Sequence, residues 1–396
     1  MNKFNLKKVQ DILINSGLEA WLFFDFRGSN DLALSILDFK SDAHLTRRFF
    51  YLIPAKGDPV KIVHAIEAHN LAHLPGTEKK YSSYKSLHIF LAEALAGKKQ
   101  VAMEYSPMNS IPYVSKVDGG TIELIRSFGV DIVSSADLIT LFDAVWTDEQ
   151  YSNNIPVGKA LVEIVKLSVE FMKSRLSEGS SLTEYDVQQF IMKEFEKREY
   201  FTDHPPIVGV NENAANPHYA PTAEVCKPVR KGDLILIDLW AKDTKLENSV
   251  WSDITWMTYA GEKVPERIEK VFNIVRDARD AALQFVTDRF NKGMEVRGWE
   301  IDECSRKYIT DAGYGEYFIH RTGHSITTSL HGSGPHLDNF ETKDERKILP
   351  STSFSIEPGI YLPGDFGIRC EIDVFVHPDG RVEYTGGEKQ KEIICF

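Results

Sequence analysis

The sequence has few of the features that mark secreted, membrane-spanning or nucleic-acid-binding proteins. Cysteine occurs four times, at scattered positions and never as CxxC, so neither a zinc knuckle nor a disulfide framework is expected. The apolar runs stay short of the roughly 20 residues needed to span a bilayer, and the opening segment lacks the apolar core of a signal peptide. A net charge of -12 disfavours general affinity for nucleic acid or anionic membrane. We expect a cytoplasmic protein that acts on small molecules or peptides.

The length of the chain predicts two domains, because 396 residues exceed the size at which one hydrophobic core stays efficient. Residues 1–155 alternate helical patterns with short apolar strands, including a strand at Trp21–Phe24 and a hairpin that turns at Gly57. This pattern indicates an α/β domain. The polar stretch DEQYSNNIPVG marks the junction, and the second domain is placed at 156–396.

The second domain repeats one order of elements. Two helical stretches, the second capped by Thr183 and Asp186, precede a group of strands. Helices over 265–290 and 299–311 then precede further strands. No residue-level repeat accompanies this order. The duplication predicts an α+β domain of two halves that face one another across a central cleft.

Carboxylates interrupt the apolar strands of the second domain. Asp238 ends the run LILID, where an unpaired carboxylate is costly to bury. Asp253 lies in WSDITW, on the strand that returns after the polar loop AKDTKLENS. Divalent cations favour carboxylates with an occasional imidazole. Taken alone, this pair of aspartates supports a metal site and a structural role about equally.

Two glutamates stand within later apolar strands, in FSIEPGIY and GIRCEID. Pro358 ends the first strand directly after Glu357, which places that carboxylate where a reactant can approach. In the second segment, strand alternation puts Arg369 and Glu371 on one face and Cys370 on the other. Taken alone, Arg369 and Glu371 indicate an ordinary buried ion pair.

Four of the twelve histidines lie in the glycine-rich segment HRTGHSITTSLHGSGPH, at positions 320, 324, 331 and 336. A solvated loop can carry one or two histidines by chance. The density here, ahead of strands that carry carboxylates, favours a metal or substrate site.

These residues together resemble metallopeptidase family M24, especially its proline-specific branch of prolidase and aminopeptidase P. The patterns that carry the resemblance are HxxxH…H, E-P-G and R-x-E, within residues 157–396. It implies a C-terminal pita-bread catalytic domain, with a creatinase/prolidase-type α/β domain before it. The metal ligands that the resemblance implies are Asp238, Asp253, His324, Glu357 and Glu371.

Several positions depart from the family's pattern. Asp238 and Asp253 are 15 residues apart (253 minus 238), longer than the family's usual spacing, which indicates a loop insertion. Trp256 stands where the family often has arginine, and Thr327 where many members have glycine. HGSGP replaces the common HExP. None of these changes removes a predicted ligand, but the substrate pocket is expected to differ in shape.

The resemblance implies a site for two divalent metal ions. Manganese is the family's usual metal, although cobalt, zinc or iron would also suit this ligand set. Glu357 would bind metal and act as the general base, while His218 and His331 would stabilise the tetrahedral intermediate. The role of His218 rests on the resemblance, since an isolated loop histidine is more often inert.

The implied substrates are proline-containing dipeptides or oligopeptides, whose Xaa-Pro bond is a tertiary amide without an N–H. Arg27, in FDFRGSND, is a candidate to close over a dipeptide carboxylate, with a plain surface turn as an equal alternative. The resemblance further assigns contacts with proline and its carboxylate to His320, His331, Tyr361 and Arg369.

We therefore expect a homodimeric Xaa-Pro dipeptidase, with an aminopeptidase that acts on longer peptides as the alternative. Two rivals of other classes are a non-catalytic peptide-binding module and a metal-free, creatinase-like hydrolase. The complete acidic ligand set disfavours both.

Overall fold

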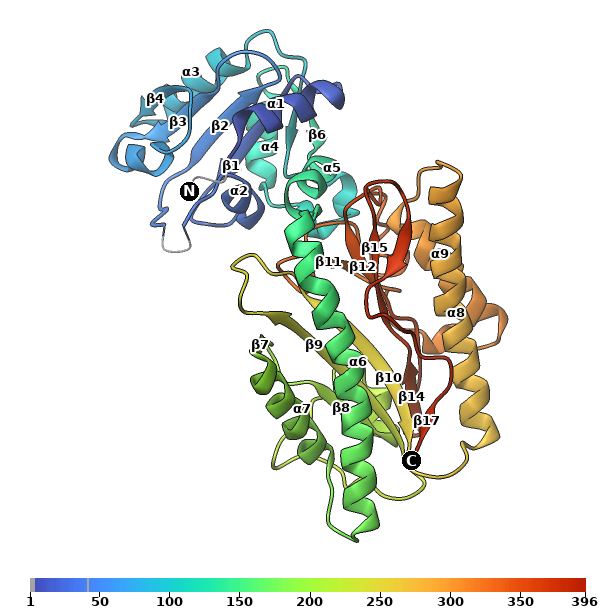
Figure 1. Ribbon diagram of the computed structural model, residues 1–396. Coiled ribbons are helices and arrows are strands. Elements are labelled where there is room, and N and C mark those ends of the chain that lie inside the picture. Colours follow the sequence, from blue (N-terminus) through green and yellow to red (C-terminus); the bar gives the residue numbers. More distant parts are fainter. Residues whose placement is uncertain (1–3, 41–42) are drawn as a thin grey trace. The chain divides into compact units, whose positions relative to one another are not determined.

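Figure 1 shows a computed structural model of the chain, which describes residues 4–40 and 43–396. The chain divides into two compact units, residues 1–143 and 144–396. The polar segment that suggested a junction forms the first turns of helix α6 (Asp148–Ser177), and the Thr147 side chain caps this helix. The predicted boundary near residue 155 therefore falls inside a helix.

The first unit is built on a mixed six-stranded sheet with the order β4-β3-β2-β1-β5-β6. Its strands are β1 (Ala20–Asp25), β2 (Phe49–Pro54), β3 (Val60–His64), β4 (Thr77–Tyr81), β5 (Gln100–Met103) and β6 (Asp131–Ser134). Its helices are α1 (Leu6–Asn15), α2 (Asp31–Ile36), α3 (Tyr84–Leu95), α4 (Gly119–Arg126) and α5 (Ala136–Ile139). Short helical turns are η1 (Ala65–Leu71), η2 (Pro107–Asn109), η3 (Pro112–Val114) and η4 (Thr140–Ala144).

The central strand β1 shows why this sheet is covered on both faces. Trp21 and Phe23 join one apolar cluster, whereas Leu22 and Phe24 join another, as the alternation of a strand requires. Every residue of β1 is buried. The predicted strand here is confirmed, and so is the hairpin, since β2 pairs antiparallel with β3 and Gly57 has φ 100°.

The second unit combines long helices with several sheets. Its helices are α6, α7 (Glu184–Arg198), α8 (Glu266–Asn291) and α9 (Gly298–Asp311), with turns η5 (Asn211–Ala215) and η6 (Gly315–Tyr317). The strands of its first half are β7 (Tyr200–Phe201), β8 (Ile207–Val210), β9 (Leu234–Asp243) and β10 (Ser252–Tyr259). Those of its second half are β11 (Ser325–Ile326), β12 (Ser353–Ile356), β13 (Gly359–Leu362), β14 (Phe366–Arg369), β15 (Ile372–Val376), β16 (Val382–Tyr384) and β17 (Ile394–Cys395).

Two helices followed by strands thus occur twice in this unit, as the sequence predicts. In Figure 1, α6 packs along β9 and β10 with α7 beside β8, whereas α8 lies next to β14 and α9 packs against α8. Helix α7 begins with the predicted cap: the Thr183 hydroxyl accepts from the Asp186 amide, and the Asp186 carboxylate accepts from the Thr183 amide.

The pairing of β9 with β10 aligns polar side chains on one face. Asp238 lies opposite Thr255, and Trp240 lies opposite Asp253, in an antiparallel register. The intervening residues of β9, such as Leu239, pack in the apolar cluster beneath α6 and α7. Because residues two apart share a face, all four of the paired residues project from the opposite face. Strand β9 continues to Asp243, so the first residues of the polar segment AKDTKLENS belong to the strand and not to the loop.

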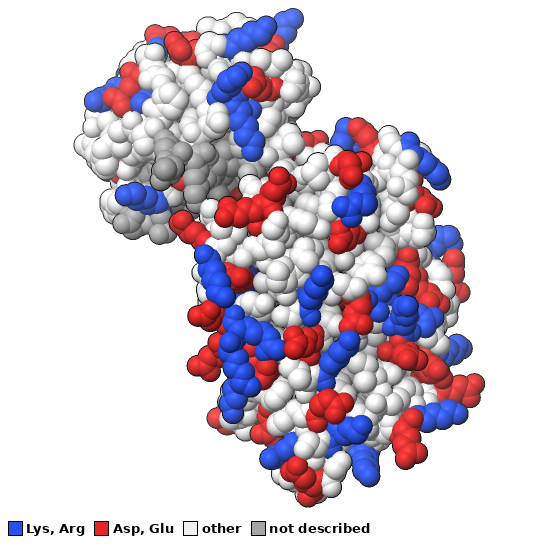
Figure 2. All heavy atoms as spheres, in the orientation of Figure 1, with Lys and Arg blue, Asp and Glu red and all other residues white. Residues whose placement is uncertain are grey.

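The surface of the second unit carries both signs of charge. On the face shown in Figure 2, lysine and arginine side chains are interspersed with aspartate and glutamate. Across residues 4–40 and 43–396, no helix is both long enough and apolar enough to cross a membrane.

Candidate metal centre

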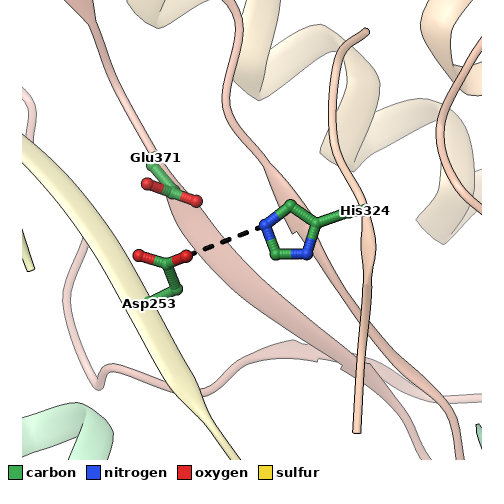
Figure 3. Close-up of side chains that lie close together, drawn as sticks. All are labelled: Asp253, His324 and Glu371. Atoms are coloured by element: carbon green, nitrogen blue, oxygen red, sulfur yellow. Dashed lines mark ion pairs between the residues drawn. The ribbon is translucent and has the colours of Figure 1, made fainter. Parts of the chain in front are cut away.

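Three of the predicted ligands converge in the second unit. One side-chain atom each from Asp253, His324 and Glu371 lies within 4.8 Å of the others, and the three side chains point toward one another (Figure 3). Asp253 comes from β10, His324 directly precedes β11, and Glu371 directly precedes β15. All three are buried, with 5%, 3% and 1% of their surface exposed.

The other two predicted ligands belong to the same network. His324 Nε2 lies 3.5 Å from Glu357 Oε1 and 3.7 Å from Asp253 Oδ2. Arg369 connects the fifth residue, because its guanidinium donates to Asp238 Oδ2 while its Nε lies 4.0 Å from Glu357 Oε2. The structure therefore brings all five predicted ligands together.

The imidazole of His324 is oriented as a metal ligand would be. Its Nδ1 lies 3.2 Å from the carbonyl oxygen of Ser325, which can only accept, so Nδ1 carries the proton. The lone pair of Nε2 then faces the carboxylates of Asp253 and Glu357. A lone pair and carboxylate oxygens repel one another unless a cation lies between them.

Two buried carboxylate oxygens in this cluster need a partner. Asp253 Oδ1 and Glu371 Oε1 accept no hydrogen bond from any residue that the structure describes. A buried polar atom without a partner is costly, and an ionised one more so. The donors are carboxylate oxygens and one imidazole nitrogen, so they fit a hard or borderline divalent cation.

Electrostatics favour the same interpretation. Burial raises the pKa of Asp253 and Glu371 well above the usual range, and the neighbouring carboxylates raise both pKa values further. Burial also raises the pKa of Asp238, although Arg369 opposes that shift. Bound cations would stabilise the ionised forms and reverse these shifts.

Thr255 holds two of the site residues in place. Its hydroxyl donates to Glu371 Oε2 at 2.7 Å and accepts from Arg369 Nε at 3.0 Å. Arg369 and Glu371 therefore share a side, as predicted, although residues 370 and 371 separate β14 from β15 and do not continue a strand. Cys370 points into an apolar cluster. The sequence analysis did not single out Thr255. Its position two residues after Asp253 was the available signal, because residues two apart in a strand share a face.

Asp373 and Ser355 are two further positioning residues that the sequence did not single out. Asp373 Oδ2 accepts a 2.7 Å hydrogen bond from the backbone amide of Asp253. The Ser355 hydroxyl donates to Glu357 Oε1 at 3.1 Å and accepts from the His324 amide at 3.0 Å. Each stands two residues from a predicted ligand on or beside a strand, so alternation was again the signal.

Gly323 permits the close approach that positions His324. A Cβ atom at this position would lie 2.0 Å from the carbonyl oxygen of Ser355. That distance is far below van der Waals contact, so any side chain would push the β11 segment away from β12.

Three of the four residues predicted to contact proline or its carboxylate, His320, Tyr361 and Arg369, form a hydrogen-bonded series beside the cluster. His320 Nδ1 lies 2.7 Å from the carbonyl oxygen of Arg321, so this nitrogen donates and Nε2 accepts from the Tyr361 hydroxyl at 2.7 Å. That hydroxyl accepts in turn from Arg369 at 3.2 Å. Burial, reinforced by Arg369, lowers the pKa of His320 to about 3, so the ring is neutral near pH 7.

The two predicted oxyanion-stabilising histidines lie near the cluster on exposed segments. The ring of His331 is 4.2 Å from that of His324, centroid to centroid, and its side chain is exposed. The neighbouring His324 is the main cause that lowers the pKa of His331, and His218 contributes to the same shift. His218 is exposed, and its backbone amide donates to Asn216 Oδ1.

Arg27, the predicted closing residue, lies in the first unit. It is exposed, has a left-handed backbone with φ 61°, and lines a cavity of about 320 Å³ with Gly28 and Asp31 among others.

Together, the duplicated α+β arrangement and the buried carboxylates around one imidazole define a protein with a divalent-metal centre. Residues 158–378, more than half of the chain, match the model of Metallopeptidase family M24. The chain belongs to this family, and the predicted resemblance is confirmed.

Curated relatives include two Xaa-Pro dipeptidases. That of Lactobacillus delbrueckii subsp. lactis is 30% identical over 229 residues, which cover 58% of this chain and 56% of the relative. That of Lactobacillus helveticus is 29% identical over 268 residues, which cover 68% of this chain and 66% of the relative. In both comparisons the matched region spans less than two thirds of the relative's length.

Solved structures resemble nearly the whole chain. Dipeptidase PepE from Mycobacterium ulcerans has a TM-score of 0.68 at 21% identity, covering 98% of this chain and 96% of that one. Recombinant prolidase from Thermococcus sibiricus has a TM-score of 0.60 at 23% identity, covering 99% and 98%. These similarities confirm the predicted α+β pita-bread fold.

Proposed function

We propose that this protein is a Xaa-Pro dipeptidase that uses two divalent metal ions, manganese first among them. One observation carries the proposal: the cluster of Asp253, His324 and Glu371 lies beside the chain of Arg369, Tyr361 and His320. The first set suits metal ions. The second set offers the rings of Tyr361 and His320 as a contact surface for proline, and the guanidinium of Arg369 as a cation. The similarity to Xaa-Pro dipeptidases supports the same assignment.

Five residues would hold the metal ions in this proposal. When bound, the cations would polarise the scissile carbonyl and lower the pKa of the attacking water. Asp373 would fix the backbone of Asp253, and Thr255 would fix the carboxylate of Glu371. The five proposed ligands are Asp238, Asp253, His324, Glu357 and Glu371.

Glu357 is the proposed general base. Its side chain is 16% exposed, more than the other carboxylates of the cluster, and the Ser355 hydroxyl orients its Oε1. It would accept a proton from the attacking water and later deliver it to the proline nitrogen. His331 and His218 would donate hydrogen bonds to the oxygen of the tetrahedral intermediate.

The proline side of the substrate would contact His320, His331 and Tyr361. An Xaa-Pro bond has no N–H to pair with a strand, so recognition would depend on ring contacts. Arg369 would receive the free carboxylate of a dipeptide. A homodimer, which rests on the family resemblance, and a cytoplasmic location, which rests on the scattered cysteines, are part of the same proposal.

Hydrolysis by metal-stripped protein, with and without added Mn²⁺, tests this function. Xaa-Pro dipeptides would be compared with Xaa-Pro-Xaa tripeptides of the same first residue. The proposal predicts Mn²⁺-dependent cleavage of the dipeptides. Cleavage of the tripeptides instead would indicate an aminopeptidase, and metal binding without either activity would indicate a binding module.

A further inference from the structure

An exposed carboxylate is held in one orientation next to the cluster. Asp203 lies between β7 and β8, and its Oδ1 accepts a 2.8 Å hydrogen bond from the indole Nε1 of Trp240. His204 Nδ1 lies 3.4 Å from the same oxygen. The Asp203 side chain is 42% exposed, so a ligand in solution can reach it.

Trp240 ties this carboxylate to the metal centre. It lies opposite Asp253 in the β9–β10 register and shares a strand face with Asp238. Asp203 accepts from the indole of this residue, which is the cross-strand neighbour of the proposed ligand Asp253. Asp203 therefore borders the cluster on the Asp253 side.

The hydrogen bond to Trp240 alone does not require an aspartate, and the nearby cation Lys242 directs its ammonium to the carbonyl oxygen of Thr328 and the ring of Trp251. A neutral acceptor such as asparagine would satisfy the Trp240 indole equally well. An additional negative charge next to several buried carboxylates raises the electrostatic energy of the site. The charge becomes favourable when a cationic group binds beside it.

Apolar side chains adjoin the same place. Trp240 and Leu330 are partly buried and pack against the cluster that contains Trp251 and Phe375. Leu330 directly precedes His331, whose ring contacts His324. Trp240 thus brings an apolar surface beside both Asp203 and Asp253.

The two ends of a dipeptide match the two charged residues around the cluster. A free dipeptide carries an ammonium at one end and a carboxylate at the other near pH 7. Arg369 approaches the cluster at Asp238, whereas Asp203 binds the indole of Trp240, the cross-strand neighbour of Asp253.

We propose that Asp203 binds the α-ammonium group of the substrate, and that Trp240 and Leu330 contact the side chain of the residue before proline. This inference rests on the proposed function and names the part of the site that selects a free N-terminus. It assigns an unblocked dipeptide with an apolar first residue as the preferred substrate.

The test compares Leu-Pro with its des-amino analogue, in which hydrogen replaces the ammonium group. The variant Asp203→Asn retains an acceptor for Trp240 and removes the charge. We expect its KM for Leu-Pro to rise about tenfold, the loss of one charge-assisted hydrogen bond, with kcat within about twofold. Its KM for the analogue should equal that of the wild type. The control variant is Glu247→Gln, an exposed acidic residue in the loop after β9 that should change neither value.

Equal effects of Asp203→Asn on both compounds, or an effect on neither, would overturn the inference. Absence of Leu-Pro hydrolysis by the wild type would reject the proposed function instead. In that case, calorimetric titration of the Mn²⁺-loaded protein with the same two compounds still tests whether Asp203 binds the ammonium group. Tighter binding of Leu-Pro that disappears in Asp203→Asn supports the inference, and equal binding of both compounds contradicts it.

Discussion

The guanidinium of Arg369 donates a hydrogen bond to Asp238 in a buried pair, with 4% and 6% of the two residues exposed. Asp238 is a proposed metal ligand, and Arg369 is the proposed receptor for the substrate carboxylate. The pair thus joins metal binding to substrate binding. Removal of one partner of a buried pair typically costs about 3 to 5 kcal/mol, because the other charge loses its partner.

The first prediction concerns the several hydrogen bonds that the planar guanidinium of Arg369 donates at once. Arg369→Lys keeps the charge but cannot reach Asp238, Thr255 and Tyr361 together. We expect kcat/KM for a free Xaa-Pro dipeptide to fall at least about 100-fold, and that for its C-terminal amide far less, because the amide lacks the carboxylate. Steady-state kinetics on both compounds measures this difference. Equal losses would show that Arg369 only orients its neighbours.

The second prediction concerns the hydroxyl of Tyr361. Tyr361→Phe removes the group that connects Arg369 with His320, and leaves buried polar atoms without partners. The free energy of unfolding should fall by about 1 to 3 kcal/mol, and KM for Xaa-Pro should rise. Urea unfolding and kinetics test both effects. Tyr308→Phe, which removes an exposed hydroxyl, is the matched control and should change neither.

The third prediction follows from the raised pKa values of the buried carboxylates Asp253, Glu371 and Asp373. A folded protein with raised carboxyl pKa values binds more protons than the unfolded chain. Without metal, its free energy of unfolding therefore falls as pH rises above about 4. Glu371→Gln removes one of these charges. The Tm advantage of the metal-stripped variant over the wild type should grow between about pH 4 and pH 8.

Added Mn²⁺ provides the control for that pH series. Metal binding stabilises the ionised carboxylates, so the variant should then be less stable than the wild type near neutral pH. A Tm difference that stays constant across pH, with and without Mn²⁺, would contradict the assignment of Glu371 to the metal site.

The fourth prediction concerns Glu184, a fully buried carboxylate at the start of α7. It accepts hydrogen bonds from the chain that surrounds His218, through Val210, Asn213, Tyr219 and Lys227. Glu184→Ala should cost about 3 kcal/mol or more of unfolding free energy, because several buried donors lose their acceptor. Thermal and urea unfolding measure this loss.

The milder variant Glu184→Gln distinguishes an effect on the stability of the fold from an effect on the position of His218. It retains an acceptor oxygen, so the fold should persist, but the loop that carries His218 loses charge-assisted bonds. We expect kcat to fall by about tenfold while KM changes little, with His218→Ala giving a similar loss at unchanged stability. Full activity of both variants would remove His218 from the mechanism.

The features predicted correctly from the sequence are those set by local pattern. Alternation within a strand placed Arg369 and Glu371 on one side and Cys370 on the other, and the Thr183 cap followed from its residue types. The start of α6 was interpreted as the domain junction because its first turns are polar and contain Pro156, whereas the two units divide at residues 143 and 144. The capping box at Thr147 and the burial of later residues stabilise that helix nonetheless.

The remaining site residues depend on contacts between strands that are distant in sequence. Thr255 reaches Glu371, and Asp373 reaches the amide of Asp253, because β10 and β15 adjoin in the fold. Asp203 meets Trp240 only because its segment runs beside β9. Periodicity within one segment carries no information about such registers, which tertiary packing determines.

The proposed metal centre is tested most directly by titrating Mn²⁺ into metal-stripped protein while bound metal and Leu-Pro hydrolysis are followed together. We predict that activity appears with binding and saturates at two ions per chain, and that His324→Ala and Glu371→Gln lower both metal binding and activity. Hydrolysis that proceeds without metal, or metal binding that neither variant weakens, would contradict it.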